Sequence, residues 1–269
     1  MFRFIAPHVP YLRNCPFMKL APLLLTTVSV LSPQAAGTLP GSPHASDLPA
    51  RETFYYNVEW RLITAGRAKV EWILQPRNDW QVNLRLESVG LVSTLFKVED
   101  NYFAYLNPSF CAESVQMDSH EGSRERDTKI AFDAAAHRAA YLERDRLKNT
   151  TLLQQEIEIP PCVHDVVGGL LYLRTLNLEP GQSVMVPVSD GKRSVMAKVQ
   201  AQSREEVKTP EGAFHTICYE AYLFNNVLYR RPAHLNIWLT DDRRRLPVQI
   251  RVRMQFTIGT ITLQLRKHE

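Results

Sequence analysis

The 269-residue sequence lacks the short motifs by which many enzymes are recognised. It contains no glycine-rich loop that would cradle a phosphate, no G-x-S-x-G nucleophile turn and no H-E-x-x-H helix. The histidines within the predicted domain are dispersed, without the paired spacing of metal ligands: His120, His137, His164, His215 and His234. We therefore expect no cofactor and no metal, and a binding protein rather than an enzyme.

The sequence also lacks a strong excess of one charge. It has 32 basic and 28 acidic residues, and residues 1–37 hold three of the bases and none of the acids. Without that stretch the chain carries 29 bases against 28 acids. Arginines cluster at residues 230–231 and 243–245, but acidic residues or a proline flank each cluster. This is typical of solvent-exposed turns. A protein surface that binds nucleic acid needs lysine and arginine residues gathered on one face, so we expect no nucleic-acid partner.

No apolar run is long enough to cross a bilayer, which takes about 20 residues. Leu20–Leu31 is the run in question, with Lys19 before it and the small residues Ala35 and Ala36 after it. This order is typical of a secretory signal, so residues 1–37 are predicted to be a signal peptide, with Met18 as an alternative start. We expect an exported chain, periplasmic or secreted, without a transmembrane span. A retained membrane anchor is the alternative.

Period-two alternation dominates the sequence after a Pro/Gly/Ser-rich stretch. Residues 38–52 are predicted to be a flexible linker, and residues 53–267 a single β-rich domain. Phe54, Tyr56, Val58, Trp60 and Leu62 alternate with more polar residues, which places them on one face of a strand. Similar segments, separated by turns such as Asp190-Gly191, continue to the end of the chain.

One segment has helical periodicity instead. Apolar residues recur at spacings of three and four from Val163 to Leu171, between Pro160-Pro161 and Pro180-Gly181. This pattern predicts one short central helix around residues 163–177. Because many one-sided strands need a shared core, we expect an all-β, mostly antiparallel fold: a strongly curved sheet or an open or half barrel around that helix.

Three cysteines follow the predicted signal peptide: Cys111, Cys162 and Cys218. An exported chain meets an oxidising compartment, in which disulfides form. Cys111 and Cys162 lie next to proline-marked loops, and Cys218 lies within a strand pattern. We expect a Cys111–Cys162 disulfide and a buried Cys218 thiol. A catalytic role for Cys162 with His164 is less favoured, because such partners usually meet through the fold.

Aromatic residues and one arginine are the candidate ligand-binding residues. The aromatics gather in the first strands and would line an apolar cavity or simply fill the core. Arg174 falls on the apolar stripe of the predicted helix, where an unpaired charge is costly. An ion pair with Glu71, Asp100, Asp241 or Asp242 that locks helix to sheet outweighs an anion-binding role. The candidates are Tyr56, Trp60, Trp72, Trp80, Tyr102 and Arg174.

Several short segments together resemble the bacterial exported family called domain of unknown function 3108. They are His164-Asp165-Val166, the segment 171–174, the segments 209–214 and 237–242, Leu246-Pro247-Val248, and Ile258-Gly259-Thr260. The resemblance covers residues 53–267 and implies an exported β-rich fold in a cell-envelope setting. It brings no established activity and no catalytic residues.

The leading hypothesis is a non-enzymatic envelope protein whose concave sheet binds a lipophilic ligand, such as a lipid, or an envelope protein segment. A structural or assembly factor that pairs its edge strands with an envelope protein is the alternative. A hydrolase of envelope polymers with dispersed catalytic residues comes third. The sequence predicts no oligomeric state.

Overall fold

The structure, a computed structural model, describes residues 48–61, 63–254 and 259–269. The predicted signal peptide (1–37), most of the predicted linker, Leu62 and Ile258 lie outside the described residues. The elements in chain order are β1 (Arg51–Trp60), β2 (Ile63–Leu74), β3 (Trp80–Ser88), α1 (Gly90–Leu95), β4 (Val98–Leu106), β5 (Ala112–Glu121), β6 (Arg124–Asp133), β7 (Arg138–Asp145), β8 (Thr150–Glu158), α2 (Gly168–Thr175), β9 (Ser183–Ser189), β10 (Ser194–Thr209), β11 (Gly212–Ala221), β12 (Ala233–Thr240), β13 (Pro247–Met254) and β14 (Thr260–His268).

All fourteen strands belong to one antiparallel sheet, in the order β8-β7-β6-β5-β4-β3-β2-β1-β14-β13-β12-β11-β10-β9. Two meanders, β1–β8 and β9–β14, are joined by the pairing of β1 with β14. The sheet does not close, and β8 and β9 form its edges. The all-β, antiparallel prediction with an open sheet is therefore confirmed.

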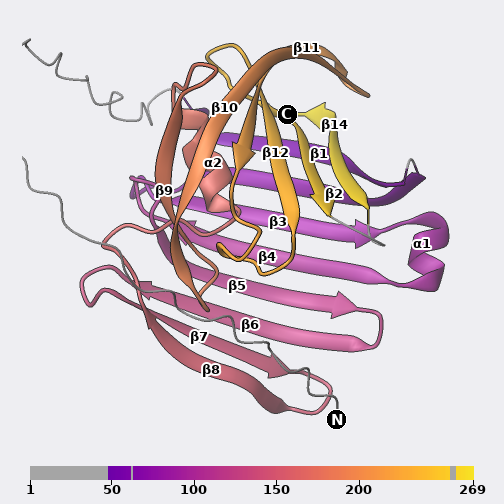
Figure 1. The fold of residues 1–269 in the computed structure, drawn as a ribbon. Helices are drawn as coiled ribbons and strands as arrows, with labels where there is room; N and C mark the ends of the chain where they lie inside the picture. Colours follow the sequence, from indigo (N-terminus) through magenta and orange to yellow (C-terminus); the bar gives the residue numbers. More distant parts are fainter. Residues whose placement is uncertain (1–47, 62, 255–258) are drawn as a thin grey trace, which may run out of the picture. The chain divides into compact units, whose positions relative to one another are not determined.

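The connection between the two meanders contains α2, which lies between the purple strands of the first and the orange strands of the second (Figure 1). Its side chains enter two groups of buried residues. Leu171 packs in the group that includes Phe54 and Trp72, and Leu173 packs in the group that includes Tyr219. The helix is thus central, as predicted, because both meanders bury their apolar faces against it.

The central helix is shorter than the sequence pattern suggests. It spans Gly168–Thr175 instead of 163–177, because the residues before it are held in other ways. His164 forms a parallel bridge with Val188 of β9, and its backbone N–H donates to the Pro187 carbonyl at 2.9 Å. Asp165 then ends the extended segment, since its side chain accepts hydrogen bonds from the N–H groups at the start of the helix.

Two other boundaries differ from the predictions. β1 begins at Arg51, within the range predicted as linker. The segment from Gly90 to Phe96, expected only to interrupt the alternation, forms the short helix α1 between β3 and β4. Gly90 opens it with a φ of 58°, a left-handed conformation that glycine adopts without strain.

Candidate binding cleft

A cleft lies on the inner face of β3–β7, and strand register builds its floor. Leu84 pairs with Tyr102, Tyr102 with Met117, and Met117 with Thr128, so one row of side chains crosses four strands. A neighbouring row contains Ile130, which like these residues borders the cleft. Because alternate residues of a strand share a face, the two rows form one mostly apolar surface.

Segments distant in sequence form the other walls of the cleft. They are the residues before α2, the turn between β9 and β10, and one residue of the β11–β12 connection. Together with the floor they enclose about 370 Å³. The wall residues are Asp165, Val166, Val167, Ser189, Asp190, Lys192 and Tyr229.

Asp165 and Tyr102 join the start of α2 to the floor. The Tyr102 hydroxyl donates a hydrogen bond to Asp165 Oδ1, which also accepts from the backbone N–H groups of Val167 at 3.0 Å and Gly168 at 2.9 Å. Burial and the neighbouring carboxylate raise the pKa of Tyr102 well above its ordinary value, so the phenol remains a neutral donor. Asp165 Oδ2 is buried and has no hydrogen-bond partner.

The β9–β10 turn closes one end of the cleft. Gly191, with a φ of 79°, lies directly against Ile130 and Tyr141; a β-carbon there would come within 2.8 Å of Ile130. The Lys192 ammonium lies 5.1 Å from the centre of the Tyr141 ring. The backbone carbonyl of Lys192 accepts a hydrogen bond from Gln155 Nε2 at 3.1 Å. A glycine is required here because only it permits both the close approach and the conformation.

The polar groups of the cleft are partly desolvated. Burial raises the pKa of the Asp100 carboxyl, although its Oδ1 accepts a hydrogen bond from the His120 N–H at 3.0 Å. Burial and the Glu143 carboxylate raise the pKa of Tyr141 to about 12, and burial raises that of Tyr229 to about 12. The tyrosines therefore offer neutral hydroxyls at neutral pH rather than nucleophiles.

Comparison with known proteins places the chain in a family. The profile of the family described as "Protein of unknown function (DUF3108)" matches residues 55–266. The chain belongs to the DUF3108 family. No curated protein matches this DUF3108 chain.

Two solved structures are similar to this DUF3108 protein. A β-barrel-like protein of domain of unknown function DUF1849 from Brucella abortus has a TM-score of 0.53 and 8% identity, over 82% of this chain and 97% of the other. A candidate exported protein with a YmcC-like fold from Bacteroides fragilis has a TM-score of 0.35 and 8% identity, over 81% and 95%. The first similarity indicates a shared fold; the second is too weak to indicate one.

Of the aromatic residues predicted to bind a ligand in the DUF3108 protein, Tyr102 alone borders the cleft. Tyr56, Trp72 and Trp80 are at most 2% exposed and pack in the core beneath the sheet. Trp60, near the end of β1, is partly buried and does not border the cleft. The structure places these four outside the inner cleft, and Tyr56, Trp72 and Trp80 fill the core, as large aromatic rings often do.

Arg174 is a structural residue in the DUF3108 fold, and its partner is none of the four acids expected. Its side chain is fully buried, and Nη1 and Nη2 donate to the two carboxylate oxygens of Glu52 at 2.6 and 3.2 Å. Nη2 also donates to the Arg244 carbonyl at 2.8 Å, and Nε donates to the Arg245 carbonyl at 3.1 Å. Its guanidinium also lies 4.9 Å from the centre of the Trp72 ring. Four of the five N–H donors of Arg174 are thus used within the protein, which indicates a structural role for this buried side chain.

Sequence reasoning missed Glu52, Asp165 and the β9–β10 turn as determinants of this region. Glu52 fell in the range read as linker, yet it shares the spacing of Phe54 and Tyr56, and that period marks it as inward-facing. Asp165 precedes Val167 and Gly168 by two and three residues, and its carboxylate accepts from their N–H groups; this spacing is the sequence signal for a helix cap.

The cysteines are placed as follows. Cys111 and Cys162 form a disulfide with a Cα–Cα distance of 5.0 Å, which ties the β4–β5 connection to the segment before α2. Cys218, on β11, is a buried thiol. His164 lies near the disulfide in sequence, but its Nδ1 is 2.7 Å from the Phe110 carbonyl and its ring stacks on Tyr172. Since the Cys162 sulfur is in the disulfide, it is no nucleophile.

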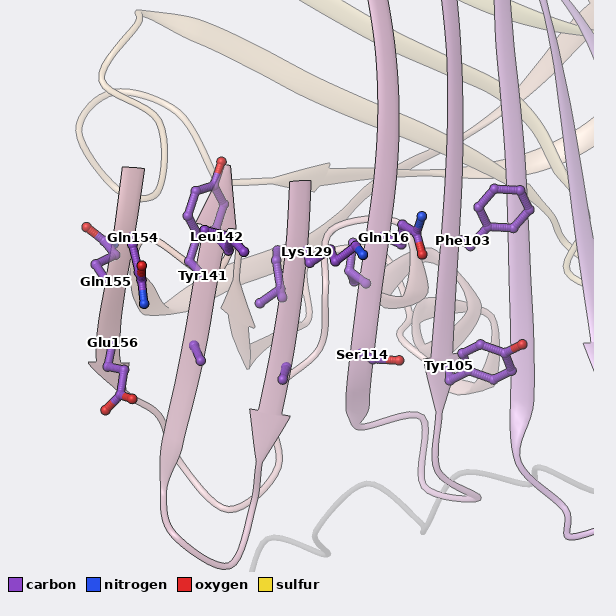
Figure 2. A pocket seen from close by; sticks show the side chains of 14 residues that line it. Phe103, Tyr105, Ser114, Gln116, Lys129, Tyr141, Leu142, Gln154, Gln155 and Glu156 are labelled. Atoms are coloured by element: carbon purple, nitrogen blue, oxygen red, sulfur yellow. The ribbon is translucent and has the colours of Figure 1, made fainter. Parts of the chain in front are cut away.

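A second depression, of about 570 Å³, lies on the outer face of β4–β8 (Figure 2). Phe103 and Tyr105 stand at one end, and Gln154 and Glu156 at the other. This depression lies over paired residues with small side chains on neighbouring strands, such as Ala131 and Ala140, and it is open to solvent. This groove reflects a local lack of side-chain volume on a single sheet face, whereas the inner cleft gathers distant segments.

Within the described residues, no group of three or more potential ligands is arranged to hold a metal ion. No helix among residues 48–61, 63–254 and 259–269 has the length and apolar character needed to cross a membrane.

Proposed function

We propose that this protein is an exported, non-enzymatic binding protein of the cell envelope, and that its inner cleft holds an apolar or amphipathic molecule such as a lipid. The observation that carries the proposal is the cleft itself. Segments distant in sequence meet around it and form a partly open cleft of about 370 Å³. That volume lies in the range of small-molecule sites, roughly 300–1,000 Å³.

The chemistry of the lining supports an amphipathic ligand. The floor offers the apolar side chains of Leu84, Leu86 and Met117, while Tyr229 and Lys192 place a hydroxyl and an ammonium at the wall. Apolar walls with a few polar groups that fix orientation are typical of small-molecule sites. A ligand with an acyl chain or ring system and one polar end matches this distribution.

The existing hydrogen bonds of the cleft support binding rather than catalysis. Tyr102 is committed to Asp165, and Tyr141 donates to Glu143 Oε2 at 3.0 Å. Asp190 Oδ1 accepts from the backbone N–H groups of Lys192 and Arg193, both at 2.9 Å. These groups hold the shape of the walls, which is the task of a preorganised binding site.

The Cys111–Cys162 disulfide supports the exported location, because disulfides persist in oxidising compartments and are rare in the bacterial cytosol. It joins two segments that flank the region of the cleft, so the compartment in which the chain folds affects the site directly.

A pair of tryptophan substitutions on one strand tests the proposal. Met117→Trp projects into the cleft and fills it, whereas Gln116→Trp, one residue earlier, projects from the opposite face. Protein recovered gently from its native envelope is analysed by native mass spectrometry and organic extraction. We expect co-purifying lipophilic molecules with the wild type and Gln116→Trp, and a reduced amount with Met117→Trp.

Absence of any small molecule from the wild-type protein, or equal loading of both variants, contradicts the proposal. A stoichiometric protein found in its place favours the assembly-factor alternative. The free backbone edge of β8 is the feature that such a partner would use.

A further inference from the structure

α1 carries the two most exposed large apolar side chains of the described residues. Leu95 is 77% exposed and Leu91 is 69% exposed, and Phe96, which follows the helix, is 52% exposed. Leu91 and Leu95 are four residues apart and therefore lie on the same side of the helix. Three large apolar side chains thus project into solvent from one short connection.

The Phe96 ring packs on one side against Gly122 of the β5–β6 turn, but the local fold does not need the two leucine side chains. The β3–β4 hairpin is closed by the Val98 N–H, which donates to Ser88 Oγ at 2.8 Å, and the entry to α1 is fixed by the Val89 N–H, which donates to the Ala65 carbonyl at 2.9 Å. Val92 and Ser93 are the helix residues turned partly inward. Polar residues at positions 91 and 95 would leave all of these contacts intact, so the exposed leucines call for a partner.

The exposed helix lies at the same end of the strands as one side of the cleft. Leu86 and Asp100, which border the cleft, pair with each other. Leu86 precedes Ser88 by two residues and Asp100 follows Val98 by two, a distance of roughly 7 Å along each strand. α1 connects these same strands beyond Ser88 and Val98, at the right of Figure 1. The exposed side chains of α1 therefore lie a few residues beyond the edge of the cleft along β3 and β4.

We propose that α1 docks on the surface of a lipid bilayer, with Leu91, Leu95 and Phe96 inserted among the acyl chains. A segment of this size is far smaller than the roughly 800 Å² that each partner contributes to a stable protein interface. Residues 90–96 also carry no charge, so they offer nothing that would select one protein partner. A bilayer needs only apolar side chains at the acyl boundary, and it tolerates a nearby exposed ion pair such as Lys97 with Glu99, whose Nζ and Oε2 lie 3.4 Å apart.

Docking goes beyond the proposed function, because it requires no occupied cleft. If both hold, α1 places the cleft beside the membrane from which an amphipathic molecule would enter. The two ideas are tested separately: an empty cleft would leave vesicle binding unchanged, and the Met117→Trp variant, which fills the cleft, would leave vesicle binding unchanged as well.

Vesicle co-sedimentation tests docking, with vesicles of phosphatidylethanolamine and phosphatidylglycerol. The Leu91→Glu/Leu95→Glu double variant is compared with wild type and with Leu147→Glu, a control at a leucine that is 63% exposed in the β7–β8 turn. We expect binding weakened by at least about tenfold in the double variant and unchanged in the control. Residues 1–47 are the same in all three proteins, so any contribution they make cancels.

A second measurement distinguishes lipid from protein as the occupant. In a Leu95→Trp variant, we expect the added fluorescence to shift to the blue with vesicles and to be quenched by lipids brominated on their acyl chains. Equal vesicle binding by the double variant, equal loss in the control, or absence of quenching overturns the proposal. A change of oligomeric state in solution caused by the double variant, without vesicle binding by the wild type, assigns the surface to a second copy instead and equally overturns it.

Discussion

At the scale of single residues, Arg174 decides how α2 is held. It belongs to the helix, its carboxylate partner Glu52 belongs to β1, and its carbonyl partners Arg244 and Arg245 belong to the turn before β13. A guanidinium can bind two segments at once, and so join them to its own helix, because its donors point in fixed, divergent directions. His268 Nε2, 3.2 Å from Glu52 Oε1, adds a contact from β14.

Replacement of Arg174 by Met tests this role. Removing one member of a buried pair leaves the Glu52 carboxylate without its countercharge, and such changes cost about 3–5 kcal/mol. We expect that loss in the free energy of unfolding measured with urea. The Glu52→Gln/Arg174→Met double variant should recover part of it, because no unpaired charge remains. Unchanged stability of the Arg174→Met variant would show that the Arg174–Glu52 ion pair does not hold α2 against the sheet.

Cys218 gives a prediction of pH dependence. Burial raises the pKa of its thiol from 9.0 to about 11. Between these values the unfolded chain loses the thiol proton and the folded chain keeps it, so stability is complete below about pH 9 and declines as pH rises toward 11. We expect wild type to lose about 1 kcal/mol more than Cys218→Ala between pH 9 and pH 10. Parallel pH profiles of the two proteins would contradict the shifted pKa.

At the scale of elements, the beginning of α2 depends on two neighbouring glycines with unequal surroundings. A β-carbon at Gly168 would lie 2.2 Å from Asp165 Oδ2 and 2.8 Å from a Leu106 methyl group. At Gly169 the nearest atom would be 3.8 Å away. Gly168 therefore has no room for a β-carbon between Asp165 and Leu106, whereas Gly169 has room for one.

Alanine substitutions at these two positions should act in opposite directions. Gly168→Ala forces the cap and Leu106 apart, and we expect a loss of about 1–3 kcal/mol in unfolding free energy. Gly169→Ala has room and gains helix propensity, so we expect a change between zero and a stabilisation of about 1 kcal/mol. Thermal melts of both variants followed by circular dichroism measure the difference. Equal effects would mean that the Asp165 cap does not fix the helix start.

The sequence predicted best the strands that bury one face and expose the other. Their alternation of apolar and polar residues, as in 66–74, can be recognised without knowing which strands pair. The start of α2 could not be predicted in this way, because Val163 is buried in an extended segment and its apolar side chain counted equally toward a helix. α1 was not predicted, because its leucines are exposed and do not follow the spacing of buried residues.

The candidate site depends on contacts between distant segments, which explains why so little of it was predicted. Tyr102 meets Asp165 across 63 residues and Arg174 meets Glu52 across 122. Sequence periodicity indicates that such side chains face inward but not which of them meet. Aromatic character alone therefore selected Trp72 and Trp80, which fill the core, in place of Met117 and Tyr229, which border the cleft.

At the scale of the whole molecule, the Cys111–Cys162 disulfide restrains 51 residues, including β5–β8. Loops of this size typically give a disulfide a stabilisation of about 2–4 kcal/mol. We expect Cys111→Ser/Cys162→Ser to lose that amount in urea unfolding, and reduction of the wild type to have the same effect. Cys218→Ser is the control for the loss of a thiol. A reduced protein as stable as the oxidised one would argue against a structural role for the bond.

The pairing of β1 with β14 has a consequence for how the chain reaches its final state. The Thr53 N–H donates to the Glu269 carbonyl at 2.8 Å, and the Glu269 N–H donates back to Thr53 at 2.9 Å. Contacts of such large sequence separation form slowly, because loop-closure entropy must be overcome before they contribute. During synthesis the centre of the sheet therefore stays incomplete until residues 260–268 emerge, so the two meanders can form before the pairing that joins them.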